Sequence, residues 1–246
     1  MELTCPCLYS VRRPRQAGPH PMIRRYPIAC FLIALSLIFI ASPFTERLAW
    51  GRLIDVILVT VMLLIAVMAV AETRRSIIIG VTLAILPMLG KFLHHFRPGL
   101  IPEPLFLFAY LLFIAFILFR LLRFVIRAKD VNSEVLCAGS SIYLVLALIW
   151  AIGYNLVERW APGSFIYTAG AASAHSMQGS VSLYFSLAVM STGPFGDIVP
   201  VSGEARMLSV AEEVVGMFYV AVLIARLVAL YSTKSPLHTE GSSRLA

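Results

Sequence analysis

Long apolar segments alternate with short polar segments along the chain. The apolar runs cover residues 27–44, 53–71, 76–92, 104–119, 135–157 and 207–230. A helix needs roughly 20 apolar residues to cross a bilayer, and it satisfies its backbone polar groups internally. The pattern therefore predicts an all-α polytopic membrane protein with six transmembrane helices.

A shorter apolar run, residues 180–190, lies between the last two spans and is too short to cross a bilayer. It is followed by a polar loop that contains glycine and proline. A bilayer tolerates such a loop only where protein or a water-filled pore surrounds it. Cation channels build a selectivity filter from a short helix and a re-entrant loop. We therefore expect a pore helix at 180–190 and a filter loop between the fifth and sixth spans, with an extramembrane turn as the alternative.

Composition and charge support the membrane assignment. Hydrophobic residues make up 59% of the 246 residues and charged residues 13%, about half the usual charged share of a soluble domain. Six spans place both termini on the same side of the membrane, and fourteen of the twenty Lys and Arg residues then lie on that side. The positive-inside rule then predicts that both termini are cytoplasmic. The net charge of +7 is therefore an orientation signal, and we expect no nucleic-acid partner.

The loop after residue 190 resembles the filter of the potassium-channel superfamily, which reads T-x-G-[YF]-G-D. Thr192 falls on the filter threonine, residues 195–197 read Phe-Gly-Asp, and Ile-Val-Pro follows them. Pro194 stands where the first filter glycine is expected, and Gly193 where a branched apolar residue is usual. The resemblance covers roughly residues 135–232. It implies an ion-conduction filter made of Ser191, Thr192, Gly193, Pro194, Phe195, Gly196 and Asp197.

The last span carries a second part of the resemblance. Its pattern Glu212-x-x-x-Gly216-x-x-Tyr219, continued by Ala-Val-Leu-x-Ala-Arg, is similar to the inner helix of small bacterial channels with a two-helix pore domain. The resemblance implies that Gly216 is an inner-helix hinge or packing glycine. It also implies that Glu212 supports the filter, since a charged group in a span is costly unless it faces water or partners.

The resemblance implies a function and a domain plan. One loop per chain cannot enclose a pore, so we expect a homotetrameric, passive cation channel in the bacterial inner membrane, with the lipid bilayer as its surroundings. The expected permeant ion is potassium, with sodium as the alternative, and we expect no cofactor, bound metal or enzymatic activity. The expected parts are a basic cytoplasmic tail (1–25), a four-helix domain (26–130), a pore domain (131–232) and a cytoplasmic tail (233–246).

Pro194 leaves a second function open. A potassium filter needs backbone conformations with positive φ, whereas proline fixes φ near −65° and lacks an N–H. We therefore expect altered potassium selectivity. The alternative is a non-conducting structural or regulatory membrane subunit with a degenerate pore. A secondary transporter would suit broken helices, but no inverted repeat is evident in the sequence.

Two further groups of residues could indicate a voltage sensor and a metal site. Arg120, Arg123 and Arg127 recur on one face of the fourth span, as in a voltage sensor. However, residues 104–119 are uncharged, and as a helix they already cross roughly 24 Å of the ~30 Å hydrocarbon core. The arginines therefore begin near the membrane surface, where most of the transmembrane electric field has already been crossed. We expect a charge anchor at the cytoplasmic surface. The adjacent His94 and His95 cannot share a helix face, and we expect a solvated loop instead of a metal site.

Overall fold

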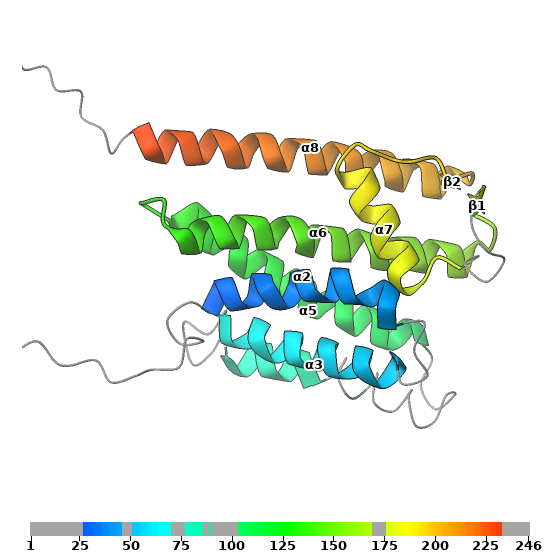
Figure 1. The fold of residues 1–246 in the computed structure, drawn as a ribbon, viewed down its shortest axis with the longest axis horizontal. Helices are drawn as coiled ribbons and strands as arrows, with labels where there is room; N and C mark the ends of the chain where they lie inside the picture. The colour runs from blue at the N-terminus through cyan, green and yellow to red at the C-terminus, as the bar shows by residue number, and fades with distance from the viewer. Residues whose placement is uncertain are drawn as a thin grey trace, which may run out of the picture.

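The computed structural model describes residues 27–45, 51–69, 77–85, 89, 103–168 and 176–232, and the fold is almost wholly helical (Figure 1). The two expected tails, 1–25 and 233–246, lie outside the described residues, as do His94 and His95. The expected third span is described as a helix over 77–85, and most of its remainder lies outside the described residues as well.

The helices lie close to the predicted positions. Their bounds are α2 Pro27–Thr45, α3 Gly51–Ala69, α5 Glu103–Arg127, α6 Ser133–Trp160, α7 Gly179–Met190 and α8 Gly203–Ser232. Within the part of the chain that the structure describes, four helices are long and apolar enough to cross a membrane: Pro27–Thr45, Leu107–Arg127, Ser133–Trp160 and Gly203–Leu230. The predicted all-α polytopic membrane fold is therefore confirmed.

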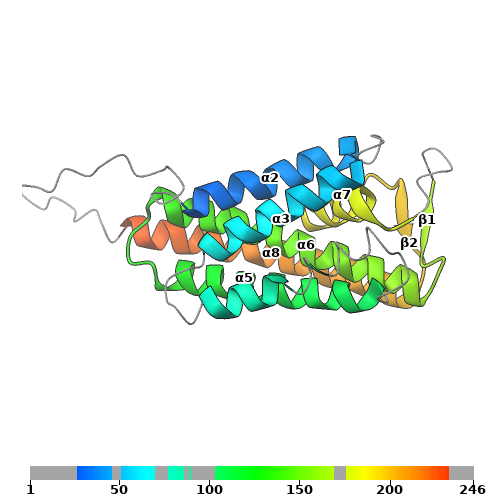
Figure 2. The ribbon, with the colours of Figure 1, turned by 90° about the horizontal axis from the view of Figure 1, so that it is seen from below.

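Helix α6 is the centre of the arrangement. It contacts α2, α5, α7 and α8, while α3 packs on α2 (Figure 1). Figure 2 shows α2 and α5 on different sides of α6. Buried side chains of α2, α3, α5 and α6 form one continuous apolar core, whose members include Leu35, Leu63, Phe113 and Ile142.

Local polar contacts fix both ends of α6. The side chain of Asn132 accepts a hydrogen bond from the Val135 N–H at 2.9 Å, which is the standard way to cap a helix N-terminus. At the other end the Glu158 carboxylate accepts hydrogen bonds from the N–H groups of Gly163 and Ser164, at 3.0 and 3.1 Å. Gly163 has φ of +84°, a conformation that glycine adopts without steric cost. The chain therefore turns sharply beyond α6.

Two short strands that the sequence pattern did not predict follow this turn. The strands β1 (Phe165–Tyr167) and β2 (Ile198–Pro200) pair antiparallel, with Ile166 opposite Val199. Phe165 also packs edge-on against Tyr154 and Phe185, with ring centroids 5.7 and 5.5 Å apart, and the latter two rings are 4.9 Å apart. This aromatic triangle ties α6, β1 and α7 together at one end of the molecule.

Candidate functional site: pore helix, filter loop and inner helix

Helix α7, the predicted pore helix, crosses between α6 and α8 and ends at Met190, about halfway along α8 (Figure 1). Gly216 lies at this contact. A Cβ atom added to Gly216 would stand 2.6 Å from the Met190 carbonyl oxygen and 2.8 Å from the Met190 Cγ. A side chain at 216 would therefore force the two helices apart. Glycine at this position lets the two backbones approach closely, as is common where membrane helices pack together.

The loop begins with a hydrogen-bonded reversal at the end of α7. The Thr192 N–H donates to the Val189 carbonyl and the Gly193 N–H to the Ala188 carbonyl, both at 2.9 Å. These two bonds and a left-handed residue at 192, with φ of +58°, define a Schellman motif. Glycine is usual at that position, and a β-branched residue there stores roughly 1–3 kcal/mol of strain.

The outer end of the loop is held by the segment that follows α6. The Thr168 hydroxyl donates to the Gly196 carbonyl at 2.8 Å, and the Thr168 N–H donates to the Asp197 carbonyl at 2.8 Å. Gly196 has φ of +80°. The Asp197 carboxylate accepts from the Ile198 N–H at 3.1 Å. Strand pairing and these bonds fix where the loop leaves the site.

The structure brings the seven predicted filter residues together in one exposed loop. Residues 191–196 are all exposed, and 79% of Phe195 is accessible to solvent. The Phe195 ring stacks on Tyr184 of α7, with centroids 6.0 Å apart and planes 14° apart. Positive φ in this loop is found at Thr192 and Gly196 and not at Gly193. Within the described residues, the carbonyls of 192–195 accept no hydrogen bond.

Glu212 lies in a buried polar cluster that joins three helices. Its side chain is 0% exposed. The Tyr154 hydroxyl of α6 donates to its Oε2 atom, and the Ser186 hydroxyl of α7 bonds its Oε1 atom. The Ser186 oxygen also lies 2.8 Å from the Ala147 carbonyl oxygen. The carboxyl group therefore connects the pore helix to both α6 and α8.

Sequence reasoning missed Tyr154 and Ser186 as parts of this cluster. Each is one of several polar residues in an otherwise apolar helix, and its position along that helix does not indicate its partner. Buried polar groups in a membrane helix generally face other protein groups, and that is the only signal that marked them.

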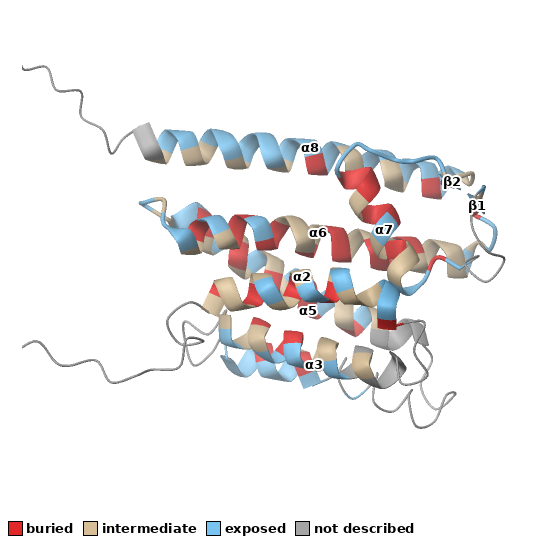
Figure 3. Cartoon of the chain, viewed as in Figure 1, coloured by how far each residue is buried: buried red, intermediate tan, exposed pale blue. Residues whose placement is uncertain are grey.

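The rest of α8 makes few contacts within the chain. The Tyr219 hydroxyl donates to the Gly139 carbonyl of α6 at 2.6 Å, and Arg226 donates to carbonyls at the end of α5. Only 6% of the most apolar stretch of α8 is buried, compared with 56% for α6. Figure 3 shows the difference as a mostly exposed α8 beside an α6 rich in buried residues.

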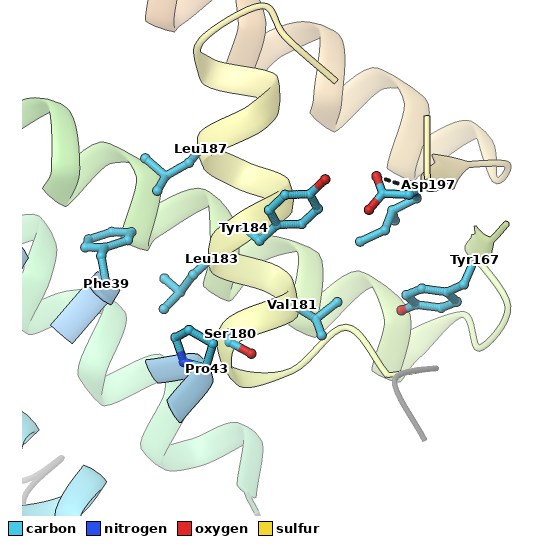
Figure 4. A pocket seen from close by; sticks show the side chains of 10 residues that line it. Phe39, Pro43, Tyr167, Ser180, Val181, Leu183, Tyr184, Leu187 and Asp197 are labelled. Carbon is cyan, nitrogen blue, oxygen red and sulfur yellow. Dashed lines mark hydrogen bonds between the residues drawn. The ribbon is translucent and has the colours of Figure 1, made fainter. Parts of the chain in front are cut away.

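A cavity of about 460 Å³ lies between α7 and the C-terminal part of α2 (Figure 4). Phe39 and Pro43 of α2 line it together with residues of α7, while Asp197 and Tyr167 stand at its outer part. Burial raises the pKa of Tyr167 to about 12, and the charge of Glu158 adds to this shift. Tyr167 therefore stays neutral at physiological pH. Helix α2, which precedes the predicted pore domain, thus helps to line the surroundings of the filter loop.

A comparison with protein families matches the part of the chain that contains this site. Residues 155–233 match the model of a family described as "Ion channel". The match contains α7, the filter loop and α8, so the resemblance to a potassium-channel pore domain is confirmed for this part of the chain. Comparisons with curated proteins and with solved structures found no match. The chain is thus a membrane protein whose C-terminal part has the features of an ion channel.

Proposed function

We propose that four copies of the chain assemble around an axis and conduct monovalent cations passively between them. The supporting observation is α8, whose apolar side chains are exposed along most of the helix. In a membrane, one side of such a helix can face lipid. In a pore made of several chains, another side of α8 would face the other copies. The loop 191–197, which one chain leaves exposed, would then lie between four subunits.

The chemistry of the loop fits cations. The carbonyls of residues 192–195 are not used by hydrogen bonds among the described residues, and carbonyl oxygens are the groups that replace an ion's hydration shell in filters. The C-terminal end of α7, which carries the negative end of the helix dipole, leads directly into this loop. Asp197 would add negative charge at the mouth. We further propose an inner-membrane location in bacteria with both termini cytoplasmic.

Selectivity is expected to be weak. Pro194 cannot take positive φ, and the left-handed residues of the loop are Thr192 and Gly196. The Gly196 carbonyl already accepts the Thr168 hydroxyl, so it is turned toward its own chain. A thousandfold preference for potassium over sodium corresponds to roughly 4 kcal/mol, which plausibly needs several carbonyl rings acting together. The same two features favour the alternative function, a non-conducting subunit with a degenerate pore.

Reconstitution separates these functions. We expect the purified wild-type protein in liposomes to conduct cations with little preference between potassium and sodium under bi-ionic conditions. Pro194→Gly should raise the potassium preference, and adding Gly193→Val should raise it further because a branched residue packs the filter. Phe195→Tyr is the matched control, because the tyrosine form of the motif is common in the family and the substitution does not change the allowed backbone conformations.

The outcomes are distinct. A wild type that already selects potassium strongly would contradict the steric argument about Pro194. A silent wild type that the double substitution makes conductive would support the non-conducting subunit, and a protein that remains monomeric in the membrane would remove the pore altogether.

A further inference from the structure

A cavity of about 160 Å³ lies at the C-terminal end of α5 and is lined mainly by arginine. Arg120, Arg123 and Arg127 face it from one side of the helix, together with Phe124 and Ala128. Arg120 is half-buried, while Arg123 and Arg127 are exposed. No acidic side chain is among the described residues that line this cavity. Three positive charges therefore converge on one small space at the end of a membrane-spanning helix.

A fourth arginine, Arg226, reduces the negative charge at this end of α5. The last carbonyls of a helix carry partial negative charge and would repel an anionic ligand. Arg226 of α8 donates to two of them, the carbonyls of Val125 and Ile126, and also to the carbonyl of Ala128, just beyond the helix. Because Arg226 covers these carbonyls, an anion in the cavity meets less repulsion from the end of α5, beside the exposed side chains of Arg123 and Arg127.

We propose that this arginine pocket binds a phosphate group. Guanidinium groups match phosphate oxygens with paired hydrogen bonds, and such charge-assisted bonds are among the stronger ones in proteins. The cavity is several times the roughly 30 Å³ that a water molecule occupies in the liquid, so it can hold a phosphate with some of its water. The group can come from a lipid head group, since the pocket lies at the end of a span, or from free phosphate.

The proposal gives the arginines a role beyond orientation in the membrane. Ala128 lines the pocket, and its carbonyl accepts from Arg226, so the ligand lies beside the contact that holds α8 to α5. Phosphate binding should therefore stabilise the α5–α8 contact. This inference concerns binding alone and stands whether or not the protein conducts ions.

The test measures binding to the full-length protein in a neutral detergent. The probes are a short-chain phosphatidic acid, inorganic phosphate and octanoate, an anion with an alkyl chain but no phosphate. We expect the phosphate-containing lipid to bind and to raise the melting temperature. Arg123→Gln and Arg127→Gln should each weaken that binding roughly tenfold, since one charge-assisted hydrogen bond is worth at least that factor.

Lys129→Gln is the matched control, because it removes one exposed charge beside the pocket without lining it. It should change the affinity by less than about twofold, as expected for a screened surface charge. Arg123→Lys keeps the charge and removes the planar fork, so it should fall between wild type and Arg123→Gln. Equal binding of lipid and inorganic phosphate would assign the site to free phosphate, and binding of the lipid alone would assign it to a head group. Equal binding of octanoate, or an equal loss in Lys129→Gln, would overturn the proposal.

Discussion

Helices α6 and α8 are alike in length and hydropathy and opposite in their surroundings. Each provides a 28-residue candidate span, whose most apolar 18 residues have a mean hydropathy of 2.3 in α6 and 2.1 in α8. Yet 56% of the α6 stretch is buried inside the chain and only 6% of the α8 stretch. Hydropathy alone therefore identifies both as spans but does not indicate which one has its partners in the same chain.

The way in which α8 does touch its own chain explains the difference. Its buried residues among those described are Ala205, Glu212 and Gly216, two of them small and one polar. Within a bilayer, apolar side chains gain little by leaving lipid for another helix, so close backbone packing and hydrogen bonds hold helices together. Helix α8 uses both, and its large apolar side chains remain for lipid or for other copies.

The same polar side chain placed in each helix should have the most different effects on stability. Ile142 of α6 is 0% exposed, while Val222 of α8 is 63% exposed. Ile142→Asn should lower the free energy of unfolding in detergent by about 4 kcal/mol, since it buries an amide and loses core packing. Val222→Asn should change it by less than about 0.5 kcal/mol. Thermal unfolding in neutral detergent measures both, and comparable losses would show that the face of α8 at Val222 also has its partners in the same chain.

The next test concerns the polar contact of α8. Glu212→Ala leaves the Tyr154 hydroxyl without its buried acceptor, removes one of the two acceptors near the Ser186 hydroxyl, and should cost about 3 kcal/mol. Glu212→Gln keeps an oxygen acceptor and the shape, so it should lose distinctly less. The neighbouring Glu213, which is half-buried, provides the control substitution Glu213→Ala. Equal destabilisation by the Glu212 and Glu213 changes would contradict the assignment of the cluster.

The smallest expected effect tests the close contact. Gly216→Ala brings a Cβ against the Met190 carbonyl oxygen and should cost about 2 kcal/mol as α7 shifts. In Gly139→Ala the new Cβ would lie 3.1 Å from methyl groups of the Leu223 side chain, which can move aside, so this control should cost less. Unfolding and cation flux in liposomes are both informative. A Gly216→Ala protein that is as stable as wild type would show that α7 is not held at that point.

The sequence predicted the helices far better than the contacts between them. Apolar length alone set the spans, because the bilayer makes the same demand on every crossing segment. The Schellman motif at Thr192 was not foreseeable, since threonine is not the residue that a left-handed helix end favours. Likewise β1 and β2 have three residues each, too few for an alternating pattern, and their pairing depends on where α6 and the loop end.

The predicted filter loop was found by its motif, whereas the residues around it depend on how helices cross. Glu212 was singled out from its place in the inner helix, but its partners Tyr154 and Ser186 come from two other helices. Gly216 was expected to act by hinging or by packing. The observed approach of Met190 favours packing, and that role stays a prediction until the substitution is made.

The contacts of α7 have a consequence for the order of events during biosynthesis. The pore helix is held by α6 and α8 of its own chain, through the aromatic triangle, the Glu212 cluster and Gly216. A newly inserted protein can therefore complete the packing of α6, α7 and α8 before it meets another copy. Assembly of the proposed tetramer would then be the docking of finished units, with a rate that depends on how many copies the membrane contains.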